Sequence, residues 1–287
     1  MSRATDDSSD HAHGTDHAHG TDHAHGTDHA HGTDHAHGTD SAGVPWAGRT
    51  FQANPGSGDD GSADPALLDA LLRFRSGDGS QVEVVDAFRS ARVLVPLVAE
   101  KGDEGVGPTG LKVDKTQELS IVTVSGPDGR RVQPAFSSVD TMRRWDAAAR
   151  PIPVEAIRVA LSASSEETDL IVLDPASDTE FVLRRPAVWA IAQEQPWEPS
   201  FLSPEVFTAL RESIGHELAV IDVAVAPGDP DARMHGPELI VTLELIDGLD
   251  RETLDAVLAR LAQRWAADDR MAVLVDSLTV KLTRSAG

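Results

Sequence analysis

The sequence predicts an α+β protein with two small domains of mixed helices and strands, preceded by a disordered tail rich in His and Asp. Some segments place apolar residues at helical spacing, and in others apolar and polar residues alternate, as in strands. Short turns rich in Gly, Pro and Asp separate several alternating segments, as in hairpins. Residues 1–63 contain almost no branched aliphatic side chains, so they cannot bury enough apolar surface to fold. We expect the tail at 1–63 and the domains at 64–196 and 197–287.

The first expected domain opens with a helix. Asp64 can cap it, Pro65 suits its first position and Gly77 ends it. Its apolar face is expected to comprise Leu67, Leu68, Leu71 and Leu72. Further helices are expected at 80–91, 138–149 and 154–164, together with a short helix that Pro186 opens.

Five strands are expected in the same domain. They are 92–99, 118–124, 130–136, 169–174 and 180–185. The second and third should pair as one hairpin and the last two as another. Pro96 fits the first strand if that strand lies at an edge. Residues 100–117 are expected to be a loop, and 193–200 a linker between the domains.

The second expected domain has the order α-β-β-α-β. Ser203 and Pro204 start a helix that Gly215 ends, and Asp250 caps a longer one. The expected strands are 217–226, 237–246 and 272–282. The last one changes its apolar phase after Asp276, as a bulge would require. This order favours a small antiparallel or mixed sheet with helices on one face.

Composition and charge exclude several classes of function. The chain has no cysteine, so disulfides and thiolate chemistry are excluded. Its formal net charge of -22 repels phosphate backbones and anionic lipids, so we expect neither nucleic acid nor membrane as a partner. No apolar run is long enough to span a bilayer, and the polar first residues do not resemble a signal peptide. We expect a cytoplasmic protein.

The unit His-Ala-His-Gly-Thr-Asp recurs five times over residues 11–40. It supplies the candidate metal ligands His11, His13, His17, His19, His23, His25, His29, His31, His35 and His37. In an extended chain, residues two apart point to the same side, so both rings of a pair can reach one Zn(II) or Ni(II) ion. The alternative is a neutral repeat expansion whose metal affinity has no use in the cell.

The segment "RRWDAAARPIP" contains a candidate docking patch for an acidic or planar partner. The patch comprises Trp145 and the flanking Arg143, Arg144 and Arg150. The alternative is that Trp145 packs into the core while Arg143 and Arg144 stay in solvent. Large aromatic side chains are usually mostly buried, which favours the alternative.

The remaining polar motifs indicate structural roles. "GDEGVGPTG" lacks the Gly-Lys-Ser/Thr ending of a phosphate-binding loop, and no GxSxG, HExxH or dinucleotide fingerprint occurs. His216 follows a helix end, where a histidine more often interacts with the helix dipole than catalyses. The loop that carries Asp229 and Asp231 can be proposed as a cation site, but its composition is typical of a turn. Ser137 and Ser138 are expected to cap the next helix.

Four segments carry a family resemblance: "LVPLVAE", "VQPAFSSVDTMRRWDAAARPIPV", "LIVLDPASDTEFVLRRP" and "DSLTVKL". In them the chain resembles the SseB family, the enhanced serine sensitivity proteins, in the two-domain form with N-terminal and C-terminal SseB domains. The resemblance implies a link to a serine-related growth phenotype but no reaction, cofactor or catalytic residue. Sulfur transfer, which is associated with the family name, conflicts with the absence of a thiolate carrier. The His-rich tail departs from the family pattern.

We therefore expect a non-enzymatic interaction or regulatory protein of the SseB type that acts on a protein partner and needs no cofactor. The runner-up is a metal-handling protein whose tail buffers or delivers Zn(II) or Ni(II). A deep polar pocket with several convergent ionisable groups would count against the first expectation.

Overall fold

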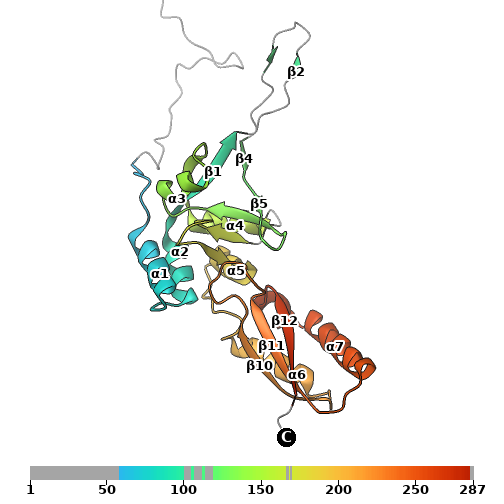
Figure 1. Cartoon of the computed structure of the whole chain (residues 1–287). Helices are drawn as coiled ribbons and strands as arrows, with labels where there is room; N and C mark the ends of the chain where they lie inside the picture. The colour runs from blue at the N-terminus through green and yellow to red at the C-terminus, as the bar shows by residue number, and fades with distance from the viewer. Residues whose placement is uncertain are drawn as a thin grey trace, which may run out of the picture. The chain divides into compact units, whose positions relative to one another are not determined.

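The computed structural model describes residues 58–99, 105–106, 112–113, 119–165, 168 and 170–284, and its fold is α+β, as predicted (Figure 1). The His-Ala-His repeat lies outside the described residues. Residues 54–287 form one compact unit. No helix in the described part of the chain is long and apolar enough to cross a membrane.

The N-terminal half combines helices with small sheets. Its helices are α1 (Pro65–Ser76), α2 (Gln81–Ser90), α3 (Val139–Trp145), α4 (Ala156–Ser165) and α5 (Arg185–Ala192). Its strands are β1 (Arg92–Ala99), β2 (Gly105–Val106), β3 (Lys112–Val113), β4 (Leu119–Ile121), β5 (Val124–Ser125), β6 (Arg131–Ala135), β7 (Arg150–Glu155), β8 (Ile171–Leu173) and β9 (Phe181–Leu183). The strands pair in the orders β4-β1-β7, β5-β6-β8-β9 and β2-β3.

The first two helices follow the local signals in the sequence. The Asp64 carboxylate accepts the N–H of Ala66 at 2.9 Å and begins α1, and Gly77 ends it with φ 84°. Ser80 begins α2 through a capping box with Glu83. Within α1, however, Leu72 is 53% exposed, so the buried face is narrower than expected.

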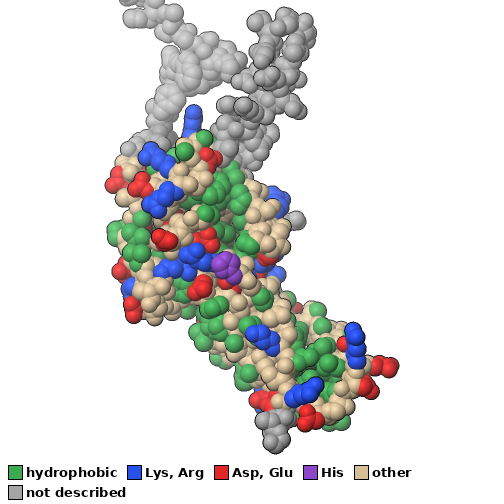
Figure 2. Space-filling view, in the orientation of Figure 1, with side chains coloured by type: hydrophobic (Ala, Val, Ile, Leu, Met, Phe, Trp, Pro, Cys, Tyr) green, Lys and Arg blue, Asp and Glu red, His purple; other side chains and the backbone are tan. Residues whose placement is uncertain are grey.

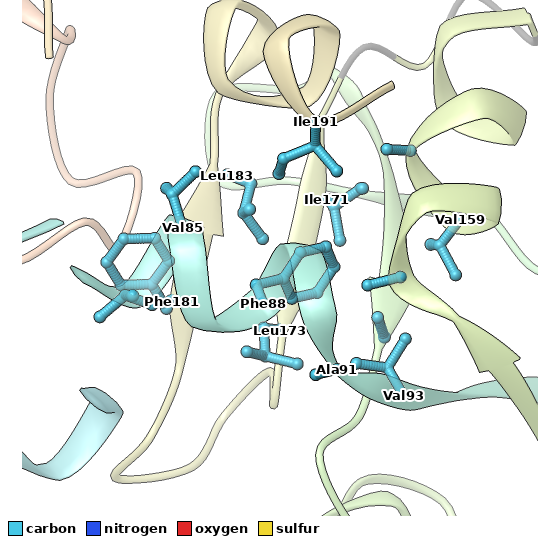
Figure 3. Packing of buried hydrophobic residues seen from close by; sticks show 14 of the residues in the cluster. Val85, Phe88, Ala91, Val93, Val159, Ile171, Leu173, Phe181, Leu183 and Ile191 are labelled. Atoms are coloured by element: carbon cyan, nitrogen blue, oxygen red, sulfur yellow. The ribbon is translucent and has the colours of Figure 1, made fainter. Parts of the chain in front are cut away.

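One hydrophobic core lies between the α1–α2 and α4–α5 helices and the strands of this half. Phe88 of α2 and Phe181 of β9 are fully buried there, and Ile171 and Leu173 of β8 lie between the helices (Figure 3). Burying a side chain of this size stabilises the fold by about 1.5–3 kcal/mol, so this cluster is the main reason the half holds its shape.

The expectation that Pro96 lies in an edge strand was wrong. The strand β1 lies in the centre of its sheet, and the segment Arg150–Glu155, expected only to separate two helices, is the edge strand β7. Pro96 faces Pro151 across the antiparallel pair. Every second pair of facing residues in an antiparallel sheet exchanges no N–H···O bonds. Two prolines can face each other only at such a position, so neither ring interrupts the hydrogen bonds between β1 and β7.

The first expected hairpin is divided between two sheets. Residues Leu119–Ile121 pair with β1, whereas Val124–Ser125 pair with Arg131 and Val132 of β6 across the predicted turn. The second hairpin, β8 with β9, is confirmed. The segment predicted as the loop 100–117 contains the short antiparallel pair of β2 and β3.

The C-terminal half is a three-stranded mixed sheet with helices on one face. Its elements are α6 (Pro204–Ile214), β10 (Val220–Pro227), β11 (Leu239–Leu245), α7 (Arg251–Ala266), α8 (Asp269–Leu274) and β12 (Leu278–Arg284). The strand β11 is central, antiparallel to β10 and parallel to β12. Its alternate residues Leu239, Val241, Leu243 and Leu245 are buried in one cluster with Val257, Leu261 and Trp265 of α7.

The expected strand 272–282 was partly wrong. Residues up to Leu274 belong to the helix α8, and the strand begins at Leu278. The apolar phase change marks this helix-to-strand transition. The register shift of this sheet lies in β10 instead, between Val220 and Asp222.

Candidate functional site

The tryptophan of the predicted docking patch packs into a small cluster beside α3. The rings of Trp145 and Phe136 lie 5.3 Å apart between centroids, and the cluster includes Leu94, Met142 and Ala149. Trp145 is half-buried in it. The structure therefore places the indole where the alternative expectation put it, as a packing residue.

The three arginines of the same patch remain in solvent. Arg143 and Arg144 lie on α3, and Arg150 begins β7 next to the buried Ala149. In the described residues none of the three forms an ion pair. Figure 2 shows basic side chains gathered over the region of α3. We call Arg143, Arg144 and Arg150 the arginine patch.

Two sets of hydrogen bonds fix the start of α3 and with it the position of the arginine patch. Ser138 is the N-cap and forms a capping box with Thr141, as expected for this serine. Ser137 does not cap. Its N–H and Oγ donate to the buried carboxylate of Asp174 at 2.7 and 2.6 Å, and Thr179 Oγ1 donates to the same carboxylate at 2.8 Å. Three donors satisfy this carboxylate and tie α3 to the turn after β8.

A second group of charged residues, of which three are buried, lies between the end of β9 and the C-terminal half. The Arg184 guanidinium, 8% exposed, contacts Asp229 at 2.6 Å and Asp276 at 3.0 Å, and both carboxylates are 2% exposed. Arg130 reaches Asp276 at 2.8 Å and Asp128 at 2.6 Å. We call these five residues the junction cluster. Burial opposes ionisation of Asp276, but the hydrogen bonds and charges of Arg130 and Arg184 lower its pKa.

Asp229 also organises the predicted turn. Its carboxylate accepts the backbone N–H groups of Met234 at 2.8 Å, Arg233 at 3.2 Å and His235 at 3.3 Å. The loop that was considered as a cation site thus directs this carboxylate to its own backbone and to Arg184. Asp231 is exposed, and its carbonyl oxygen accepts from Arg75 at 2.6 Å. Among the described residues, no group of three or more His, Asp or Glu side chains is arranged to hold a metal ion.

Glu238 adds a buried carboxyl group beside the junction cluster. Its Oε2 accepts the N–H of Asp276 at 2.6 Å. Burial raises the pKa of Glu238, and the nearby charge of Asp276 acts in the same direction. Glu238 therefore holds its proton to higher pH than an exposed glutamate would.

An open groove of about 770 Å³ borders the junction cluster. Asp128, Arg130, Asp276 and the exposed His235 line it. Several ionisable groups do converge here, which is the feature that would count against a non-enzymatic role. However, Arg130 lies between Asp128 and Asp276 and pairs with both, and the groove is open rather than deep. His216, the other histidine in the described residues, is exposed just after α6.

Sequence reasoning missed the junction cluster. Arg184 and Asp276 are 92 residues apart, and nothing in their local context indicates that they meet. One signal was available: Asp276 is the one charged residue in the segment 272–280, most of which is apolar.

One comparison with known proteins finds a match, and it lies in the N-terminal half. Residues 66–190 match the model of the SseB protein N-terminal domain. This match contains α1 to β9, the arginine patch, Arg130 and Arg184. The expected C-terminal SseB domain is not shown. No curated protein and no solved structure matches the chain.

Proposed function

Residues 66–190 form an SseB N-terminal domain, and from this premise we propose that the protein is a non-enzymatic interaction protein that binds an acidic partner through Arg143, Arg144 and Arg150. The partner is a protein whose surface presents several carboxylates to α3 and the start of β7. The indole of Trp145, which lies on α3 with Arg143 and Arg144, contacts the ring of Phe136 and so helps to hold this helix in position.

The observation that carries the proposal is that Arg143, Arg144 and Arg150 are exposed and form no ion pair within the described residues. Other arginines of the same half face an acidic side chain, namely Arg73, Arg89, Arg92, Arg130, Arg158 and Arg184. Arg75, Arg131 and Arg185 form no ion pair either, but their guanidinium groups donate hydrogen bonds to other groups of the chain, and within the described residues Arg143, Arg144 and Arg150 have no such bond. An acidic surface would supply the missing carboxylates, and arginine suits this contact because its guanidinium binds carboxylates in a bidentate way.

The non-enzymatic part of the proposal is supported by how the buried charges are used. Asp229 and Asp276 both pair with Arg184, and Asp174 accepts three hydrogen bonds. A general base needs a carboxylate within reach of a substrate proton. These carboxylates are directed instead to groups of their own chain.

The test is the binding of a fluorescently labelled deca-glutamate peptide, measured by anisotropy. The wild-type chain should bind it, and a triple variant with Arg143→Gln, Arg144→Gln and Arg150→Gln should bind at least about tenfold more weakly, since each exposed pair contributes about 0.5 kcal/mol. The matched control removes three exposed arginines elsewhere, by Arg131→Gln, Arg158→Gln and Arg251→Gln. Equal affinity of the triple variant and the wild type would contradict the proposal.

The family resemblance adds a cellular test. If the arginine patch carries the SseB function, cells that contain only the triple variant should show the same growth response to excess serine as cells that lack the protein. Normal growth of these cells, with the variant present at the wild-type level, would separate the patch from the serine phenotype.

A second candidate function is the buffering of Zn(II) or Ni(II) by the tail, and the five His-Ala-His pairs favour it. Calorimetric titration of the full chain should show several equivalents of bound metal near neutral pH. Binding should weaken below about pH 6.5, where histidine becomes protonated. A full-length variant with the ten repeat histidines replaced by Asn serves as the control, and equal binding by this variant would refute the metal function.

A further inference from the structure

We propose that a pocket beside α5 binds the cationic side chain, Arg or Lys, of an extended segment of a partner protein. The pocket has a volume of about 280 Å³. Its walls come from α5, from the segment between α5 and α6, from the start of α6, and from α8, and they include Trp189, Trp197, Gln193, Gln195, Glu198 and Glu205. We call it the tryptophan pocket. It carries the opposite charge to the arginine patch and therefore selects a different partner.

The aromatic wall of the tryptophan pocket suits a cation. Tryptophan attracts cations to its ring face more strongly than other aromatic side chains do. The protein already forms one such contact, because the Arg185 guanidinium lies 5.2 Å from the centroid of the Trp189 ring. Arg185 itself donates to the carbonyl oxygens of Ala272 and Val275, which holds it in place. Trp197 packs on its other side against the main core, so its position is also fixed.

The rim of the tryptophan pocket supplies negative charge. Glu198 and Glu205 line the pocket, are exposed, and form no ion pair within the described residues. Glu194, exposed at the end of α5, is in the same situation. Two unpaired carboxylates around an aromatic wall are complementary to a guanidinium or an ammonium group, whose apolar stem can lie along the indoles.

Neighbouring residues indicate that the cation belongs to a protein segment. Val273, on the rim, is 50% exposed, and Leu202, between Trp197 and α6, is 61% exposed. Apolar residues that flank the inserted side chain can cover both. The exposed amides of Gln193 and Gln195 offer donors and acceptors to an extended backbone. Such an arrangement combines a central charged anchor with an apolar and polar surround.

The test uses the peptide acetyl-Ala-Pro-Arg-Leu-Pro-amide and its citrulline analogue, which keeps the shape of arginine but has no charge. The indole N–H signals of the full-length protein are followed by NMR and assigned with Trp189→Phe and Trp197→Phe. The arginine peptide should shift the signals of Trp189 and Trp197, and the citrulline peptide, which lacks the charge that the indoles and carboxylates attract, should bind at least about tenfold more weakly.

Charge variants locate the site. The double variant Glu198→Gln with Glu205→Gln should weaken binding of the arginine peptide about tenfold. The matched control, Glu244→Gln with Glu252→Gln, makes the same change in net charge on β11 and α7, outside the pocket lining, and should bind like the wild type. Equal binding of the two peptides, absence of shifts at both indoles, or an equal loss in the control would each overturn the proposal.

Two further outcomes identify a different occupant. If acetyl-arginine-amide binds as tightly as the peptide, the pocket takes a small cation and the protein segment is wrong. If the indole shifts appear on concentrating the protein alone, together with a larger mass in light scattering, the occupant is a second copy of this chain. Binding of deca-glutamate depends on the arginine patch only, so failure here leaves the proposed function separately testable.

Discussion

Arg184 is buried and pairs with two buried carboxylates at once. Replacing Arg184 with Met leaves Asp229 and Asp276 buried with less compensation. Removing one partner of a buried ion pair typically costs about 3–5 kcal/mol. We predict a loss of this order in the free energy of unfolding, measured by urea denaturation.

The matched control for this prediction is Arg158→Met. Arg158 pairs with Glu155 on the surface, where its side chain is 73% exposed, and this change should cost less than about 1 kcal/mol. Similar losses in the two variants would mean that the junction cluster contributes no more than an exposed ion pair.

For Glu238 we predict a substitution that stabilises the folded protein, whereas Arg184→Met should destabilise it. Because burial raises its pKa in the folded state, the folded protein binds this proton more tightly than the unfolded chain does. Its contribution to stability is therefore full at acidic pH and is lost as the pH rises from the unfolded pKa through the higher folded pKa. Glu238→Gln mimics the protonated form and should raise the melting temperature at pH 7.5 but change it little at pH 4.5. A lower melting temperature at pH 7.5 would show that the ionised form is needed for the hydrogen bond from Asp276.

At the scale of elements, helices with local signals could be predicted and segments controlled by distant partners could not. Caps at Asp64, Ser80 and Asp250 determine where α1, α2 and α7 begin, and all three lie next to their helices in sequence. The segment Arg150–Glu155 has no such signal. It becomes a strand because β1 offers a free edge, and tertiary context of this kind overrides local preference. The helix α8 does have a local signal, the N-cap Asp268, which the expectation of a strand at 272–282 overlooked.

The candidate sites also divide into one that the local sequence could predict and two that depend on residues far apart in the chain. The arginine patch could be proposed from sequence because its residues lie within eight positions of one another. The tryptophan pocket and the junction cluster could not, since each joins α5 or β9 to residues near 273–277. Trp145 shows what neighbouring residues in the sequence cannot decide. Its residue type and the flanking arginines were compatible with docking or with packing, and only the contact with Phe136 places it in the hydrophobic cluster beside α3.

The α3 helix gives a test at this scale. Ser138→Ala removes the side chain that accepts the N–H of Thr141, and losing such an N-cap costs about 1 kcal/mol. We predict this loss in urea denaturation and weaker deca-glutamate binding, because α3 carries two of the three arginines. Ser165→Ala, which removes only a hydrogen bond to the carbonyl oxygen of Ser162 in the last turn of α4, is the control. Unchanged stability of Ser138→Ala would show that the Asp174 contacts hold α3 without its cap.

For the whole molecule, the net charge of -22 makes self-repulsion a general cost of folding. Raising NaCl from about 0.05 to about 0.5 M shortens the screening length and should increase the melting temperature at pH 7.5, whereas the buried pairs of the junction cluster are screened much less. The same increase in salt near pH 4.5, close to the ordinary pKa values of Asp and Glu, should have a smaller effect. A falling melting temperature at pH 7.5 would mean that surface ion pairs outweigh the repulsion.

The order of the elements along the chain has a consequence for biosynthesis. A ribosome completes Arg184 before Asp276, which follows 92 residues later, and β12 follows Asp276. While the intervening residues are being made, Arg184 lacks one of its two carboxylate partners and the central strand β11 lacks its parallel neighbour β12. An open strand edge of this kind makes the nascent protein prone to aggregation and to recognition by chaperones until β12 has been added.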